Sequence, residues 1–378
     1  MSSTDRDNAA AAALSGLLAM TPVRLTALLD GRTPGEAWDA VTAGTHPQDP
    51  RHRFTTSARA TDVGEVGERY SRAGVLILRP DRPDYPSAVV GDPGAPAVLF
   101  ALGDPSVIEG RPRVAIVGTR SPTPYGLQVA SDMAADLADA GVVVVSGLGI
   151  GIDGAAHAGV VRSGSTTAAP PTAVVGTGLD TPYPLQNKGL WTEVASTGVV
   201  FSEAAVGTPP RSHRFLARSR IIAALSDVVV VVESHYREES TYTVEAAARR
   251  SIPVCAVPGS VRSRPSDGTN QLLVDGCTPV RDATDILVAV YLAREARGLP
   301  LGMPRRDDSA PEHASGPLTD SARRGPDQQP NEVEPAPSTL GGPGGRDGGD
   351  DRDGTDGWGA ARRVVSAPQA ARGARTHW

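Results

Sequence analysis

The stretch that decides the fold is VVVVSGLGIGID, residues 142–153. Its four consecutive valines are apolar at every position, which is typical of a strand buried on both faces of a sheet. A glycine-rich turn then leads into a segment of helical composition. Two similar units lie on either side, VAIVGTR at residues 114–120 and VVVVVES at residues 228–234. These units predict a parallel sheet covered by helices on both faces.

Strand and helix candidates alternate from residue 74 to residue 290. Strands are predicted at residues 75–78, 114–117, 142–146, 172–175, 199–202, 228–233 and 253–257. Helices are predicted between them, at residues 125–140, 153–162, 188–196, 215–225 and 241–250. This alternation predicts a doubly wound α/β fold with a mainly parallel sheet.

Composition divides the chain into three regions. Residues 1–73 form an N-terminal helical module and linker, with leucines at helical spacing and Pro22 and Pro34 where new helices can begin. Residues 74–298 form the α/β domain. Residues 299–378 form a tail, and its last 76 residues include 12 Gly and 9 Pro. Such a segment buries too little apolar surface to offset its ordering entropy, so we expect the tail to be disordered.

The charge balance is acidic overall. The chain has 36 Arg and one Lys, Lys188, against 43 Asp and Glu, which gives a net charge of -6. This balance argues against a protein that coats nucleic acid with a basic surface, but it leaves room for a local basic site. With aromatic residues at 4% of the chain, a base-stacking platform must be small.

Cysteine, metal and membrane signals are weak. The two cysteines, Cys255 and Cys277, are too few for a disulfide framework or a Cys-rich zinc module. No spacing of His, Cys and carboxylates predicts a metal site, and no cofactor is predicted. No segment reaches the ~20 apolar residues that span a bilayer, and the N-terminal apolar run lacks a cationic lead. We therefore expect a cytoplasmic protein.

Glycine and hydroxyl residues follow several of the predicted strands. The carboxyl ends of parallel strands share one edge of the sheet, so these turns are expected to lie together. Glycine lets backbone N–H groups approach an anion, and helix N-termini add partial positive charge. Each turn alone fits an ordinary strand-to-helix connection, but several in succession favour a phosphate site. The residues concerned are Gly118, Thr119, Arg120, Ser146, Gly147, Gly151, Asp153 and Gly176.

The same region matches the dinucleotide fingerprint GxGxxG at residues 149–154. That fingerprint requires an acidic residue at the end of the next strand, about 20 residues on. Here the next strand leads into Gly176-Thr177 instead, so the sequence argues against NAD binding.

An arginine cluster lies in residues 211–220, which hold four Arg, one His and no acid. Arg near a helix N-terminus opposes the helix dipole, so an external anion is one explanation for Arg214, Arg218 and Arg220. A solvated or interface-forming face is the other. Phe215 fits either a base-stacking role or the core.

No catalytic constellation is convincing. His157 follows Asp153 by four residues, which fits a base with its orienting acid or a structural contact at a helix start. Glu233 ends an apolar run and fits either a site acceptor or a strand-end contact. No nucleophile can be assigned, so no catalytic residue is predicted.

Taken in order, a set of short motifs resembles the DNA-processing protein A family, also called DprA or Smf. The resemblance covers about residues 75–288. The motifs are Tyr85-Pro86, PAVLF at 96–100, Gly103-Asp104, VAIVGTR at 114–120, SGLGIGID at 146–153, GTGLD at 176–180, Tyr183-Pro184, Asn187, Ser202-Glu203, FLARSRIIA at 215–223, AVPGS at 256–260 and GTN at 268–270.

The resemblance implies an extended Rossmann-like fold that binds single-stranded DNA. It also implies loading of the RecA recombinase during DNA uptake and natural transformation, a non-enzymatic role, and a homodimer. The DNA pocket of the family would be carried by Gly118, Arg120, Ser146, Gly147, Arg218, Arg220 and Lys188. With the anion-site candidates above, the predicted site comprises Gly118, Thr119, Arg120, Ser146, Gly147, Gly151, Asp153, Gly176, Lys188, Arg214, Phe215, Arg218 and Arg220.

Two positions depart from the family pattern. Ser219 lies between two arginines where the family usually has Asn, and Glu239 stands where a Ser-Gly-Ser-Leu-like turn has Gly. A carboxylate beside an anion site either weakens DNA binding or marks a branch with another ligand. The alternative function is therefore a nucleotide sensor or a phosphoribohydrolase on the same scaffold. A scaffold protein acting through its tail is a third class.

Overall fold

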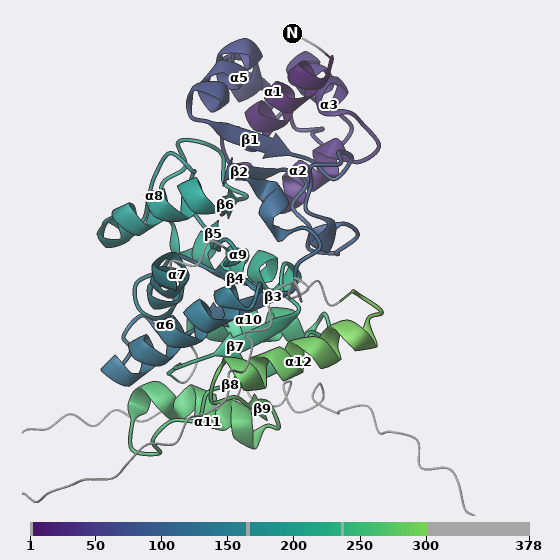
Figure 1. Cartoon of the computed structure of the whole chain (residues 1–378). Helices are drawn as coiled ribbons and strands as arrows, with labels where there is room; N and C mark the ends of the chain where they lie inside the picture. The colour runs from purple at the N-terminus through teal and green to yellow at the C-terminus, as the bar shows by residue number, and fades with distance from the viewer. Residues whose placement is uncertain (1–2, 164–166, 236–237, 301–378) are drawn as a thin grey trace, which may run out of the picture. The chain divides into compact units, whose positions relative to one another are not determined.

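The computed structural model describes residues 3–163, 167–235 and 238–300. The predicted disordered tail lies outside this part of the chain from residue 301 on. Within the described residues, nine strands form one sheet in the order β1-β2-β6-β5-β4-β3-β7-β8-β9 (Figure 1). The strands are β1 Val75–Leu78, β2 Leu99–Gly103, β3 Arg113–Val117, β4 Val143–Ser146, β5 Thr172–Val175, β6 Val199–Ser202, β7 Val228–Val231, β8 Val254–Ala256 and β9 Thr278–Pro279.

The sheet is mainly parallel. All neighbouring strands in the run β6-β5-β4-β3-β7-β8-β9 pair in parallel. Strands β1 and β2 form an antiparallel edge beside β6. The predicted α/β class is therefore confirmed. The strands at residues 172–175 and 199–202 have the predicted bounds. Strands β2 and β9 were not predicted.

Helices cover both faces of the sheet and cap its antiparallel edge. The α-helices are α1 Ser3–Ser15, α2 Pro22–Leu29, α3 Pro34–Ala43, α4 Thr55–Arg59, α5 Val63–Arg72, α6 Pro124–Asp139, α7 Ile152–Ser163, α8 Lys188–Thr197, α9 Ser212–Ala224, α10 Glu239–Ala248, α11 Asp267–Val274 and α12 Ala283–Ala296. The sequence did not predict α4, α11 and α12. None of the described helices is both long and apolar enough to cross a membrane.

Strand β7 shows why the valine runs decide the fold. Val228 and Val230 point into a core built with α6, α7 and α12, while Val229 and Val231 enter a second core built with α9 and α10. Side chains alternate across a strand, so burying both sets requires helices on both faces. The predicted doubly covered sheet is thus present.

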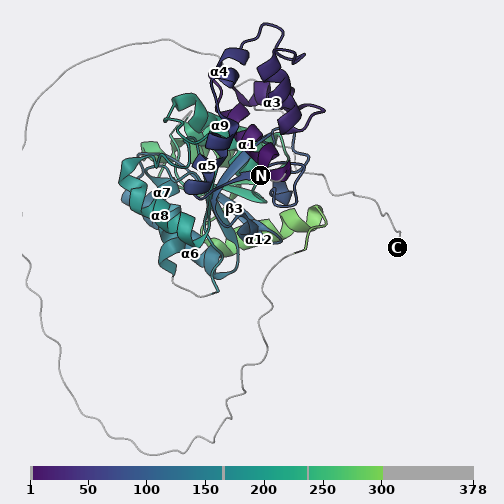
Figure 2. The same ribbon diagram turned by 90° about the horizontal axis from the view of Figure 1, so that it is seen from above.

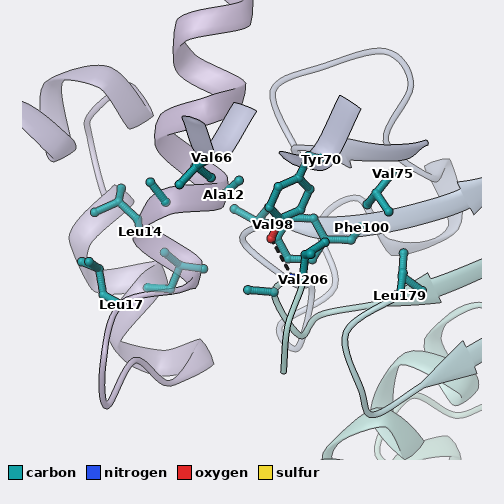
Figure 3. Packing of buried hydrophobic residues seen from close by; sticks show 14 of the residues in the cluster. Ala12, Leu14, Leu17, Val66, Tyr70, Val75, Val98, Phe100, Leu179 and Val206 are labelled. Carbon is teal, nitrogen blue, oxygen red and sulfur yellow. Dashed lines mark hydrogen bonds between the residues drawn. The ribbon is translucent and has the colours of Figure 1, made fainter. Parts of the chain in front are cut away.

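The N-terminal helices share a core with the sheet. Leu14 and Val66 from α1 and α5 belong to the same buried cluster as Phe100 of β2 (Figure 3). The Tyr70 ring packs on Phe100 with centroids 5.1 Å apart, and its hydroxyl accepts a hydrogen bond from the Val206 backbone N at 2.9 Å. Seen from above, α1, α3, α4 and α5 gather together (Figure 2). The helical module predicted for residues 1–73 is therefore packed on the sheet.

The Tyr70→Phe variant tests this junction. Burial raises the pKa of Tyr70 to about 12, so its hydroxyl stays neutral. Removing the hydroxyl leaves the buried N–H of Val206 without an acceptor, and we expect the unfolding free energy to fall by about 1–3 kcal/mol. Urea unfolding measures the loss. Tyr291→Phe is the control, because this ring is 44% exposed, and equal losses in both variants would contradict the prediction.

Candidate nucleic-acid interface

The candidate site lies where the chain reverses its direction of travel across the sheet. From β3 the chain builds β4, β5 and β6 on one side, and it then returns to place β7 on the other side of β3. Open α/β sheets bind ligands outside the carboxyl ends of the strands at such a switch point. The turn after β3, residues 118–120, lies there beside the start of α7 and the segment after β7.

Two glycines in this region are required by close backbone contacts. A Cβ on Gly118 would lie 2.5 Å from the Glu233 carbonyl oxygen, and the neighbouring Thr119 N–H donates to that oxygen at 2.7 Å. Gly151 has φ +86°, and a Cβ there would lie 2.3 Å from the Thr119 carbonyl oxygen. Glycine is the residue that allows both features. The predicted phosphate turn is therefore clamped between the end of β7 and the start of α7.

Arg218 is the buried cation of the site. Its side chain is 5% exposed and reaches from α9 to the carbonyl oxygens of Gly147 and Val174. It also pairs with the carboxylates of Asp153 at 3.4 Å and Glu239 at 3.5 Å. Its Nε has no hydrogen-bond partner, although it is buried. This guanidinium is thus held rigidly at the strand ends with one donor unused.

The position of Arg218 corrects one argument from the sequence. Helix α9 begins at Ser212 rather than near residue 215, so Arg218 lies well inside the helix. The helix dipole therefore gives no reason to expect an external anion at Arg218. The residues around it in the sequence contain no acid, but carboxylates from other elements partner it in the fold.

Arg120 is the accessible cation of the site. Its side chain is 55% exposed, and it forms an ion pair with Glu239. The guanidinium carbons of Arg120 and Arg218 lie 5.5 and 5.3 Å from the centroid of the Phe215 ring. Phe215 is only 9% exposed. It therefore acts as a packing platform for the two arginines rather than as an open stacking surface.

Tyr183 is an aromatic residue that the sequence reasoning did not include in the site. Its ring lies 5.4 Å from the Phe215 ring and is 42% exposed. A half-exposed ring next to the aromatic ring that both guanidinium groups contact is suited to stacking on a base. The glycine-rich turn that precedes it, residues 176–180, was the available signal.

Arg214 and Arg220 do not line this pocket. Arg220 forms an ion pair with Glu203 at 2.5 Å, and its Nη1 has no partner. Burial raises the pKa of Glu203, while Arg220 acts in the opposite direction. Burial also lowers the pKa of Arg214. The arginine motif thus divides, with Arg218 in the pocket and Arg220 bound to Glu203.

Asp153 and His157 are both buried but do not form an acid–base pair. Burial raises the pKa of Asp153 to about 6, opposed by the charge of Arg218. Burial lowers the pKa of His157 to about 4. The His157 ring nitrogens lie 3.1 Å from two backbone carbonyl oxygens, those of Asp153 and Thr172. The structural interpretation of this pair is therefore correct, because the Asp153 carboxylate faces Arg218 instead.

Several other predicted residues do not line the pocket. The Ser146 hydroxyl donates to the Ile116 carbonyl at 2.6 Å, which ties β4 to β3. Gly176 packs against the backbone of α9, and Lys188 is exposed at the start of α8. The Glu233 carboxylate accepts from the backbone and hydroxyl of Thr123, so it is a structural contact. Within the described ranges, no three His, Cys, Asp or Glu side chains group as metal ligands.

The pocket itself is small and charged. Gly118, Arg120, Asp153, Arg218 and Glu239 are among its lining residues, and its cavity volume is about 20 Å³. Two guanidinium groups with a rigid aromatic support are suited to an anion with several oxygens, such as a phosphate.

Comparison with known proteins assigns this architecture to a family. The family model of "DNA recombination-mediator protein A" matches residues 76–291. The chain belongs to this family. A Mycobacterium tuberculosis protein that carries the DprA name is 37% identical over 287 residues, which is 73% of each chain. The DNA processing protein DprA of Bacillus subtilis is 33% identical over 217 residues, 57% of this chain and 72% of that protein.

Solved structures agree with this assignment. DNA processing protein A from Streptococcus pneumoniae superposes with a TM-score of 0.63 at 29% identity, covering 74% of this chain and 95% of the other. The Helicobacter pylori protein, whose structure was described for its unique single-stranded DNA binding mode, superposes with a TM-score of 0.50 at 29% identity. This second match covers 58% of this chain and 96% of the other. The family suspected from the ordered motifs is thus confirmed.

Proposed function

We propose that this recombination mediator binds single-stranded DNA in the pocket beyond the carboxyl end of β3, which residues of α7, α9 and α10 line. The observation that carries the proposal is Arg218, a buried guanidinium with one unused donor beside the accessible Arg120. The Helicobacter pylori relative described as binding single-stranded DNA supports the choice of ligand. Arginine neutralises phosphates along the strand, and Tyr183 offers a ring to a neighbouring base.

The family assignment supports a second step. We propose that the bound strand is passed to the RecA recombinase during DNA uptake and natural transformation, by a non-catalytic homodimer in the cytoplasm. The measurement is recombinase filament formation on single-stranded DNA coated with a single-strand binding protein. The protein should accelerate filament formation, and an unchanged rate would contradict this step.

The Arg120→Ala variant tests the DNA site. Loss of one phosphate contact should weaken binding of an oligothymidylate about tenfold. It should also make the plot of log K against log salt shallower, by up to about 0.7, the full value for one phosphate contact on a single strand. Fluorescence anisotropy at several salt concentrations measures both quantities, with double-stranded DNA for comparison.

The matched control is Arg249→Ala. Arg249 is exposed directly after α10, and it pairs with Glu245 of that helix at 3.7 Å, away from the pocket. This variant removes the same charge as Arg120→Ala. Its affinity for the oligothymidylate and the salt dependence of binding should therefore stay close to those of the unmodified chain. Equal effects of both substitutions would mean that overall charge, rather than this pocket, binds the strand.

A further inference from the structure

One carboxylate holds both cations of the pocket. Glu239 is the first residue of α10, and its two oxygens contact different arginines. One oxygen pairs with Arg120, and the other lies 3.5 Å from Nη2 of Arg218. The Glu239 carboxylate thus occupies the position between the two guanidinium groups where a phosphate would have to bind.

The enclosed part of the pocket is small while Glu239 is in place. The cavity of about 20 Å³ is close to the volume that one water molecule requires. A phosphate that takes the position between the two guanidinium groups must displace the carboxylate. The Glu239 side chain is 23% exposed, so it has an open path toward solvent.

Arg218 keeps other partners when Glu239 leaves. Its guanidinium still contacts Asp153 and the Gly147 and Val174 carbonyl oxygens. Glu239 is therefore not needed to satisfy the buried arginine. Its neighbour Glu238 differs, because its carboxylate accepts from the Thr119 hydroxyl at 3.0 Å and contacts His235. Glu238 holds the phosphate turn, whereas Glu239 holds only the two cations.

We propose that Glu239 is an internal competitor of phosphate that sets the affinity and salt dependence of strand binding. This inference rests on the proposed function of the site. With Asp153 and Glu239 opposite Arg120 and Arg218, the four charged groups sum to zero. The counterions released on binding come from the phosphates of the strand. A Glu239 carboxylate displaced by a phosphate binds a cation from solution in turn, so the net release and the salt dependence are reduced.

The Glu239→Gln variant tests the proposal. The amide keeps the size of the side chain and removes its charge, so both arginines become free for phosphate. We expect an oligothymidylate to bind about five- to tenfold more tightly at low salt. The slope of log K against log salt should become steeper, by up to about 0.7 for each of the two arginines.

The control is Glu245→Gln on the same helix. Glu245 is exposed and pairs with Arg249, so this variant has the same net charge as Glu239→Gln but leaves the pocket unaltered. Thermal melting should show both variants folded. An unchanged affinity and slope in Glu239→Gln, or equal changes in the two variants, would overturn the inference while the proposed function stands. Binding by none of the three proteins would overturn the proposed function itself, and this inference with it.

Discussion

The Asp227→Asn variant is expected to lose about 3–5 kcal/mol of unfolding free energy, the usual cost of removing one partner from a buried ion pair. Asp227 is fully buried just before β7. Its carboxylate accepts from Arg294 at 2.8 Å and Arg297 at 2.7 Å, and it also pairs with Arg113 at 3.4 Å. A single carboxylate thus pairs with three arginines.

The large loss of unfolding free energy is expected because the arginines would remain buried without a negatively charged partner. Arg113 and Arg294 have side chains only 10% and 3% exposed, so they cannot turn to water. The amide of asparagine would place an N–H₂ group against a guanidinium in place of one carboxylate oxygen. Because Arg294 belongs to α12 and Arg113 to β3, the loss also loosens the helix from the sheet.

Chemical unfolding measures the loss, with Asp39→Asn as the control. Asp39 pairs with Arg6 at 2.9 Å, but both side chains are 58% exposed, so its loss should cost at most about 1 kcal/mol. Asp227 precedes its strand, at the edge opposite the pocket, so the folded fraction should bind DNA normally. A loss below about 1 kcal/mol for Asp227→Asn would show that the three arginines do not depend on this carboxylate.

The sheet could be predicted because its strands are locally unambiguous. The residues of β5 and β6 are buried at every position, and their apolar runs have clear ends. Strand β2 is buried at its first three positions, but it lies in the antiparallel part of the sheet, outside the regular alternation of strands and helices. The helices α11 and α12 follow the last predicted strand, beyond the same alternation.

The charged partners of the site could not be predicted from local sequence. Glu239 follows Arg120 by 119 residues and Arg218 by 21, so only the folded sheet brings the three together. The departure at Glu239 was visible in the sequence, whereas its contact with both arginines was not. Arg218 and Arg220 are two residues apart, so a helix directs them to different sides. The acids that they reach, Asp153 and Glu203, come from other elements and could not be assigned from the local sequence.

The Arg218→Met variant should weaken binding of single-stranded DNA by about 10- to 100-fold, because a charge-assisted hydrogen bond contributes about 1.5–3 kcal/mol. Methionine keeps much of the packing volume against Phe215 but removes the buried charge. Arg220→Met is the matched comparison on the same helix, since Arg220 pairs with Glu203 outside the pocket. If Arg220→Met reduces binding equally while remaining folded, the assignment of the pocket to Arg218 is wrong.

The same substitution should also change how stability depends on pH. Burial already raises the pKa of Asp153 to about 6, and the loss of Arg218 removes the charge that opposes this rise. A carboxyl whose pKa is higher in the folded state than in the unfolded state stabilises the fold while it is protonated, and this contribution is lost as pH rises. At pH 5 Asp153 is mostly protonated with or without Arg218, so Arg218→Met should cost little through this ion pair. At pH 8 the folded variant must either bury an unpaired Asp153 carboxylate or keep this carboxyl protonated, and both cost free energy. The unfolding free energy should therefore be lower than that of the unmodified chain by about 3 kcal/mol. Urea unfolding at the two pH values measures the difference, and a deficit that is the same at both would mean that Asp153 does not depend on Arg218.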